Sequence, residues 1–190
     1  MLTQIATLLV DVVAGFIVFL LLARFLFQWL RVPFRNPLGE FVLAATNWMV
    51  VPARRIVPAF AGLDLATLIL AWLAQGLALC LLYTIRGWDF GSAPGIAAGV
   101  LALLAVLDIL RYNLYILVFA VVVQAVLSWV SPYSPAAPIL DPMTRPFLRP
   151  IRRFVPPLAN VDMSPLVLFV LLQVLLIPLA HLRELVGGML

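Results

Sequence analysis

The sequence predicts an all-α membrane protein with about four transmembrane helices in two parallel repeats. Three observations predict this class: an apolar composition, four long apolar stretches, and a basic segment that occurs twice. Of the 190 residues, 65% are hydrophobic and 11% are charged. A soluble domain has about 25% charged residues, so this chain has too few polar side chains to cover its apolar surface in water. The expected solvent is therefore the lipid bilayer.

Four apolar stretches are long enough to cross a bilayer, which takes about 20 residues. They cover approximately residues 5–30, 65–85, 109–130 and 165–182. The third lies within a longer apolar stretch over 96–130, which is either one long helix or a surface helix followed by a span. No basic leader with a cleavage site precedes the first stretch, so we expect a retained helix rather than a signal peptide.

A basic segment flanked by proline occurs at residues 52–58 and again, 98 positions later, at 150–156. At this offset Arg54 and Arg55 correspond to Arg152 and Arg153. Further pairs at the same offset are Asp64 with Asp162, and Thr46 with Thr144. Such self-similarity predicts repeated structural units. We assign residues 1–92 to the first repeat and 93–190 to the second, each with an apolar helix, a connector and a second apolar helix.

The positive charges indicate how the repeats are oriented in the membrane. Eight of the twelve basic residues, all arginine, lie in the two connectors: Arg31, Arg35, Arg54, Arg55, Arg145, Arg149, Arg152 and Arg153. Short loops rich in arginine stay in the cytoplasm, so both connectors are expected there and both termini on the periplasmic side. Repeats of the same orientation are related by an axis along the membrane normal.

Both connectors are too apolar to be free loops. Leu38–Val51 predicts a short helix that either lies in the membrane interface or enters the bilayer and returns. Its counterpart over 139–148 contains Pro142 and Pro146, which we expect to break a helix.

The residues of the second connector resemble the signature of the YggT family, whose plant and cyanobacterial members are called YlmG-like. The resemblance is carried by residues 144–157 and by 161–166, with Ser128 and Trp129 upstream, and in the first repeat by Asn36-Pro37-Leu38 and Arg54-Arg55. The second repeat is closer to the family pattern, since the first has Asn47-Trp48 where the second has Arg145-Pro146.

This resemblance implies a small integral membrane protein of the bacterial inner membrane or of plastids. It implies links to cell division, to the assembly of membrane complexes and to osmotic or potassium homeostasis, but no reaction. With one cysteine, Cys80, and one histidine, His181, we expect no metal site, no cofactor and no enzymatic activity.

Two hypotheses of function remain. The first is a non-enzymatic accessory or scaffold protein that presents connector arginines to anionic lipid and to a membrane-protein partner, or to further copies of itself; no direct nucleic-acid contact is expected. The candidate arginines are Arg54, Arg55, Arg145, Arg149, Arg152 and Arg153. The second is an ion or solute pathway, which needs an oligomer because four spans line a pore poorly, and which would be supported if Arg24, Asp11 and Gln124 lined a continuous hydrated cavity.

Individual residues have narrower expectations. Asp64 and Asp162 precede membrane helices, where they can cap the helix and pair with arginine. Arg24 lies within the first span but near its cytoplasmic end, where its side chain can extend to the surface. The pair Asp108 and Arg111 has the spacing for a salt bridge on one helix face. The aromatic residues Trp29, Trp88 and Trp129 are expected in the interfacial belt.

Overall fold

The computed structural model describes residues 1–58, 63–88, 90, 94–130, 136–155 and 162–189, and of Trp129 the backbone alone. Its regular elements are six helices. They are α1 (Leu2–Trp29), α2 (Pro37–Ala53), α3 (Leu65–Ile85), α4 (Pro94–Val130), α5 (Ala137–Ile151) and α6 (Ser164–Gly187). Four of them, α1, α3, α4 and α6, are long and apolar enough to cross a membrane. The predicted fold class is therefore confirmed.

The long apolar stretch of the second repeat is a single helix. Residues 96–107 and 109–130 both belong to α4, which has 37 residues. The alternative of a separate surface helix is therefore wrong. Asp108 does not interrupt the helix, because its carboxylate is buried and paired, as described below.

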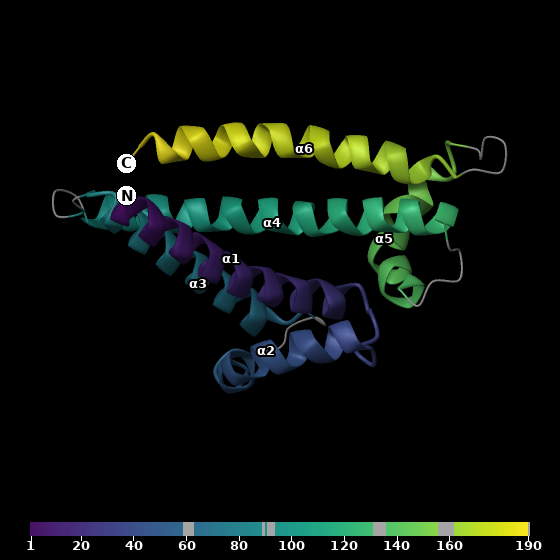
Figure 1. Cartoon of the computed structure of the whole chain (residues 1–190), viewed down its shortest axis with the longest axis horizontal. Helices are drawn as coiled ribbons and strands as arrows, with labels where there is room; N and C mark the ends of the chain where they lie inside the picture. The colour runs from purple at the N-terminus through teal and green to yellow at the C-terminus, as the bar shows by residue number, and fades with distance from the viewer. Residues whose placement is uncertain (59–62, 89, 91–93, 131–135, 156–161, 190) are drawn as a thin grey trace.

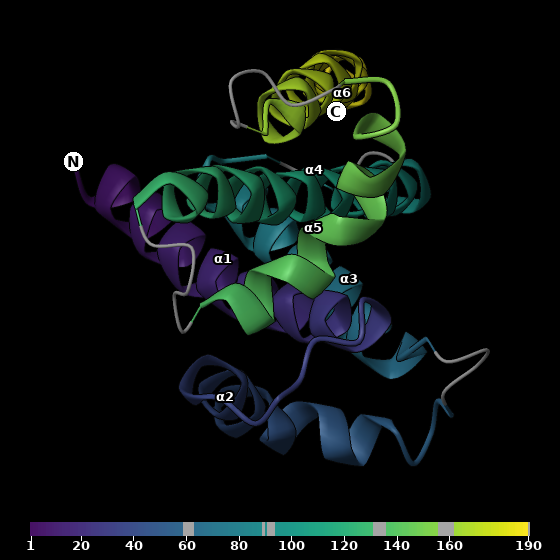
Figure 2. The same cartoon turned by 90° about the vertical axis from the view of Figure 1, so that its right-hand side faces the viewer.

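The four long helices form a bundle in which α2 lies below the end of α1 and the start of α3, and α5 lies beside the end of α4 (Figure 1). Both chain termini, the end of α3 and the start of α4 lie at the opposite end. Each short helix packs against the two long helices of its own repeat: α2 against α1 and α3, α5 against α4 and α6. Viewed along the bundle, α2 and α5 lie on different sides of its connector end (Figure 2). The helices α3 and α1 pack against α4 and so join the two repeats.

The core lies where α1 meets α3 and α4. Val18, Leu21 and Leu22 of α1 are fully buried and pack in one cluster with Ala71 and Ile116. The outward faces of the long helices are also apolar, and they include Leu77, Phe119 and Ile177, each more than half exposed. Continuous exposed apolar surface of this kind is suited to lipid rather than to water.

The turn between α1 and α2 is fixed by three residues. Arg31 has a φ of 56°, a left-handed conformation that ends α1. Asn36 caps α2, since its Oδ1 accepts a hydrogen bond from the Gly39 N–H at 2.8 Å. A Cβ at Gly39 would lie 2.7 Å from the carbonyl oxygen of Phe34, so only glycine fits there. The start of α2 is thereby held close to the end of α1.

The expected break in the second connector does not occur. Helix α5 continues through Pro142, Pro146 and Pro150. Their spacing of four residues places them on one face of the helix, which in α5 is mostly the exposed face. The carbonyl groups that lose an N–H partner to proline lie on the same stripe, where solvent or lipid headgroups can bind them.

Candidate functional site

At the connector end of the first repeat, Arg54 forms an ion pair with Asp64. The Arg54 Nη2 lies 2.5 Å from Asp64 Oδ2 and donates a second hydrogen bond to Gln28 Oε1 of α1 at 3.0 Å. Asp64 caps α3, because its Oδ1 accepts from the Thr67 N–H and its Oδ2 from the Thr67 hydroxyl. The side chain of Asp64 is 1% exposed. This ion pair joins the end of α2, the start of α3 and the end of α1.

Asp64 is ionised in spite of its burial. Burial alone would raise the pKa of this carboxyl group. The hydrogen bonds from Arg54 and Thr67 and the positive charge of Arg54 outweigh burial, and the pKa lies below its usual value. The ion pair therefore persists at neutral pH.

The second repeat has the corresponding ion pair between Arg152 and Asp162. The Arg152 Nη2 lies 2.8 Å from Asp162 Oδ2, and Nε donates to the same oxygen at 2.9 Å. The Ser164 N–H donates to Asp162 Oδ1 at 2.9 Å. Asp162 is 33% exposed, far more than Asp64. Burial would raise the pKa of Asp162, but the bonds from Ser164 and Arg152 outweigh it and lower the pKa.

A second polar contact in each repeat joins the first span to its connector helix. In the first repeat, Arg24 Nη1 donates to Thr46 Oγ1 at 2.7 Å and to Asn47 Oδ1 at 2.9 Å. Arg24 is 2% exposed, and its Nε has no partner among the described residues. The expectation that Arg24 extends to the membrane surface is therefore wrong: α2 covers it and supplies its acceptors.

In the second repeat, Gln124 occupies the place of Arg24. Its Nε2 donates to Asp141 Oδ1 at 2.8 Å, and its Oε1 accepts from the Thr144 hydroxyl. Thr46 and Thr144 thus have equivalent roles, and both are buried. The internal repeat in the sequence pairs these two threonines, but it does not predict that each contacts the first span of its own repeat.

The remaining arginines of the connector end have no side-chain hydrogen bond or ion pair with any described residue. They are Arg31, Arg35, Arg55, Arg145, Arg149 and Arg153, and all are exposed. The exposed acidic residues on these connectors are Glu40 and Asp141. The eight connector arginines thus divide into two classes. Arg54 and Arg152 hold the fold together, whereas the other six face outward without a partner among the described residues.

Asp108 pairs with Arg183 rather than with Arg111. Arg183 Nε lies 2.5 Å from Asp108 Oδ1, and Gln75 Nε2 donates to Asp108 Oδ2 at 2.9 Å. Arg111 instead donates to the Tyr115 hydroxyl and lies over its ring, 5.3 Å from the centroid. The prediction of an Asp108–Arg111 pair is therefore wrong, since a buried carboxylate found two donors on neighbouring helices. These donors lie on α3 and α6, so no spacing within α4 could have indicated them.

The tryptophans lie as follows. Trp29 at the end of α1 is half exposed and stacks on Phe25, with ring centroids 6.1 Å apart. Trp88, near the opposite end of the bundle, contacts Tyr83 edge to face. The side chain of Trp129 lies outside the described residues. Trp29 and Trp88 are at the two ends of the spans, as an interfacial belt requires.

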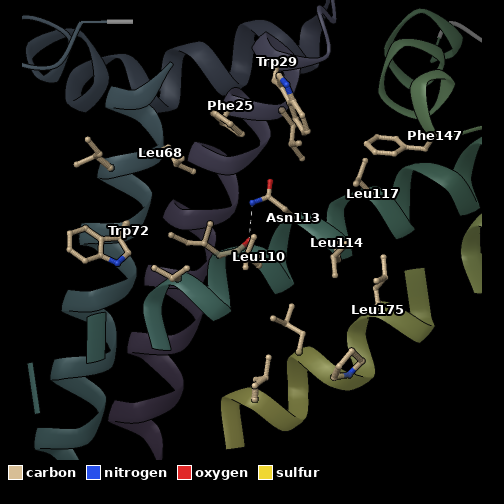
Figure 3. A pocket seen from close by; sticks show the side chains of 17 residues that line it. Phe25, Trp29, Leu68, Trp72, Leu110, Asn113, Leu114, Leu117, Phe147 and Leu175 are labelled. Carbon is tan, nitrogen blue, oxygen red and sulfur yellow. Dashed lines mark hydrogen bonds between the residues drawn. The ribbon is translucent and has the colours of Figure 1, made fainter. Parts of the chain in front are cut away.

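At least two cavities lie within the described part of the chain. The larger, about 760 Å³, lies among the long helices and is lined almost wholly by apolar side chains (Figure 3). The smaller, about 230 Å³, lies between α4 and the start of α6 and has Asp162 in its wall. None of Arg24, Asp11 and Gln124 lines either cavity. No three His, Cys, Asp or Glu side chains among the described residues come together to hold a metal ion.

Comparison with known proteins agrees with the repeated fold. The family model CCB3/YggT matches residues 3–85 and again 94–183. The protein YggT of Escherichia coli K12 is 32% identical over 186 residues, which cover 97% of this chain and 94% of that protein. An uncharacterized protein of Pseudomonas aeruginosa is 33% identical over 160 residues, 82% of this chain and 78% of its own. No solved structure matches the chain significantly. The chain belongs to the CCB3/YggT family.

Proposed function

We propose that this protein is a non-enzymatic accessory or scaffold protein of the bacterial inner membrane. Its connector helices lie on the cytoplasmic side and bind anionic lipid and a membrane partner. The observation that carries the proposal is the outward face of α5. Arg145 and Arg149, one helical turn apart, are both exposed and without a partner among the described residues. Anionic lipid headgroups supply the phosphates that such a face lacks.

The division of the arginines supports this reading. If the arginines served only to hold the fold, each would have a carboxylate partner. Arg54 and Arg152 have one, but the six outward arginines of the two connectors have none among the described residues. Each uncompensated arginine near an anionic membrane surface contributes about 1 kcal/mol to binding. The family links to cell division and to the assembly of membrane complexes suggest that a protein partner shares this face.

The alternative of an ion or solute pathway has less support. Its candidate residues line neither of the two cavities described above, and the larger of these has an apolar wall. Arg24 is held by Thr46 and Asn47 instead of facing an open path. The alternative would therefore need an oligomer with a pathway between copies.

The lipid part of the proposal is tested by native mass spectrometry of the purified protein with phosphatidylglycerol. The double variant Arg145→Gln with Arg149→Gln should weaken retention of this lipid by about 2 kcal/mol, roughly 30-fold. The matched control, Arg86→Gln with Arg111→Gln, removes the same charge outside the connectors and should retain the lipid. Equal retention by all three proteins would refute this part.

The partner is tested with a photo-crosslinking residue at Pro138, an exposed position near the start of α5. We expect an adduct with a membrane protein that disappears in the Arg145→Gln, Arg149→Gln background and persists in the control background. The same probe at Trp88, at the other end of the bundle, should not form it. An adduct indifferent to the two arginines would show that the α5 face does not bind the partner.

A further inference from the structure

The position of α2 along α1 sets its depth in the bilayer. The start of α3 marks one edge of the hydrocarbon layer, because the 21 residues of α3, about 31 Å, match the roughly 30 Å thickness of that layer. Arg54 joins Asp64 at this edge to Gln28 of α1. Val42 of α2 packs in one cluster with Leu20, which precedes Gln28 by eight residues, about 12 Å along α1. Helix α2 therefore lies beside α1 rather than beyond its end, as Figure 1 also shows.

The outward side of α2 is apolar. Four residues on this side are each about half exposed or more: Leu38, Phe41, Trp48 and Val51. Helix α2 has no charged residue after Glu40. The indole N–H of Trp48 donates to the Ala45 carbonyl oxygen at 2.9 Å, so this exposed ring needs no polar partner outside its own helix. The outward side of α2 therefore continues the apolar surface that the long helices turn toward lipid, which includes Phe19 of α1.

Helix α5 lies beside the long helices of the second repeat in a similar way. Leu148 packs in one cluster with Val121 of α4 and Leu172 of α6. Leu172 is eight residues from the start of α6, about 12 Å along its axis. On the outward side of α5, Arg145 and Arg149 are exposed, and their long side chains can place the charge at the headgroups. Both short helices thus occupy the same leaflet, on the side where α1 and α4 end.

The molecule is therefore wider in one leaflet than in the other. On the side where α1 and α4 end, the two short helices lie beside the long ones, whereas at the opposite end the described residues add no further helix to the bundle. We propose that the protein acts as a wedge in the bilayer. Acyl chains of the connector-side leaflet cover the outward side of α2, and the protein prefers membranes that are convex on that side. Helices inserted into one leaflet are sensitive to curvature for the same reason.

The preference for curvature comes from the shape of the molecule and from the apolar side of α2. It does not require that the arginines of α5 bind anionic lipid, so either proposal can fail without the other. The competing occupant of the α2 side is a protein, either a second copy of the chain or another partner. A protein there would shield α2 from lipid as well as from water.

The depth of α2 is measured with spin labels on single cysteines in a Cys80→Ala background, in liposomes. The labelled positions are Trp48→Cys on α2, Phe119→Cys on the lipid-facing side of α4 and Arg55→Cys just after α2. The label at Trp48→Cys should collide with oxygen, which dissolves in hydrocarbon, and not with a water-soluble nickel chelate, as at Phe119→Cys. The label at Arg55→Cys should show the opposite. Access of nickel at Trp48→Cys would overturn the proposal, as would shielding from both reagents, which would assign this side of α2 to a protein.

The curvature preference is measured as the density of fluorescently labelled protein on a narrow lipid tube drawn from a giant vesicle, relative to its density on the vesicle. With the connector side outward, which access of a thiol reagent to Arg55→Cys confirms in a parallel sample, the wild type should be denser on the tube. Phe41→Gln with Trp48→Gln should remove this enrichment, since polar side chains withdraw α2 from the acyl chains. Both residues are exposed, so this variant should fold, which its thermal unfolding checks.

The matched control is Arg145→Gln with Arg149→Gln, which changes the outward side of α5 and should retain the enrichment. Equal density of the wild type on tube and vesicle, or depletion from the tube, would overturn the proposal. Loss of enrichment in the α5 variant but not in the α2 variant would also overturn it, because the arginines rather than the inserted helix would then be the cause.

Discussion

The two repeats hold their connectors with equivalent polar contacts at different depths. In the first repeat the carboxylate of the Arg54–Asp64 pair is almost inaccessible, and Gln28 and Thr67 complete its surroundings. In the second, Asp162 of the Arg152–Asp162 pair is one-third exposed. A buried ion pair is costly to break from one side, whereas an exposed one contributes little. The two Arg–Asp pairs have the same residue types at the same spacing, but we expect them to contribute differently to the free energy of unfolding.

The connector helices also differ in what they present outward. Helix α2 exposes Phe41 and Trp48, whereas α5 exposes Arg145 and Arg149. The contacts beneath the two helices differ as well. Helix α2 covers a buried cation, Arg24, whereas α5 contacts the neutral side chain of Gln124. The comparison indicates that the first repeat anchors the fold, and that arginines lie on the exposed face of the connector helix itself in the second repeat but not in the first.

The largest expected effect comes from removing the carboxylate in each repeat. Asp64→Ala should lower the apparent free energy of unfolding by about 3 kcal/mol, because it removes a helix cap and one half of a buried pair. Asp162→Ala should cost about 1 kcal/mol, since its pair is partly exposed. Denaturant unfolding in a mild detergent measures both. Equal losses would show that burial does not distinguish the repeats.

The threonines give the next largest difference. Thr46→Val deprives the buried Arg24 guanidinium of an acceptor and should cost about 2 kcal/mol, since bonds to charged groups are stronger. Thr144→Val removes a bond to the neutral Gln124 and should cost about 1 kcal/mol. The same unfolding assay applies, with valine chosen because it matches threonine in shape. A larger loss for Thr144→Val would reverse the assignment of the first repeat as the anchor.

The pH dependence of stability provides a third comparison. Both carboxylates have a folded pKa below the unfolded value of about 4. Their stabilisation is therefore complete above pH 4 and is lost as the pH falls through the lower folded pKa. Asp64→Asn should flatten this acid loss more than Asp162→Asn, in unfolding curves recorded between pH 7 and pH 2. If Asp64→Asn loses stability at low pH as much as the wild type does, groups other than Asp64 cause that loss.

The smallest effects separate the paired arginines from the outward ones. Lysine cannot make the forked contacts of Arg54 with both Asp64 and Gln28, so Arg54→Lys should cost about 1 kcal/mol. Arg55→Lys should stay within about 0.5 kcal/mol, since Arg55 is exposed and has no partner among the described residues. Thermal unfolding of the two variants in parallel is sufficient. Equal losses of stability in the two variants would mean that Arg55 also makes a contact that stabilises the fold.

Much of the fold follows from the sequence. The apolar stretches predicted all four long helices, because a span must satisfy its own backbone and so extends without a break. The repeat offset predicted both Arg–Asp pairs, since their partners are only ten residues apart. The helix through Pro142 and Pro146 was missed, because a proline pattern alone does not show that the affected face is exposed.

The contacts between distant helices could not be predicted in the same way. Asp108 and Arg183 are 75 positions apart, and their pairing depends on how α6 packs against α4. Arg24 has apolar neighbours in the sequence, so only the position of α2 shows that Thr46 covers it. The larger cavity likewise exists only in the packed bundle, because its lining comes from five helices.

The parallel arrangement of the repeats is tested most directly by labelling equivalent positions from one side of the membrane. Arg55→Cys and Arg153→Cys are exposed counterparts, and Arg86→Cys lies at the other end of the bundle. Each is made in a Cys80→Ala background and treated with an impermeant maleimide in spheroplasts, before and after permeabilisation. The parallel repeats predict that Arg86→Cys is labelled at once and that the two connector positions are labelled only after permeabilisation. Immediate labelling of one connector position without the other would contradict the arrangement.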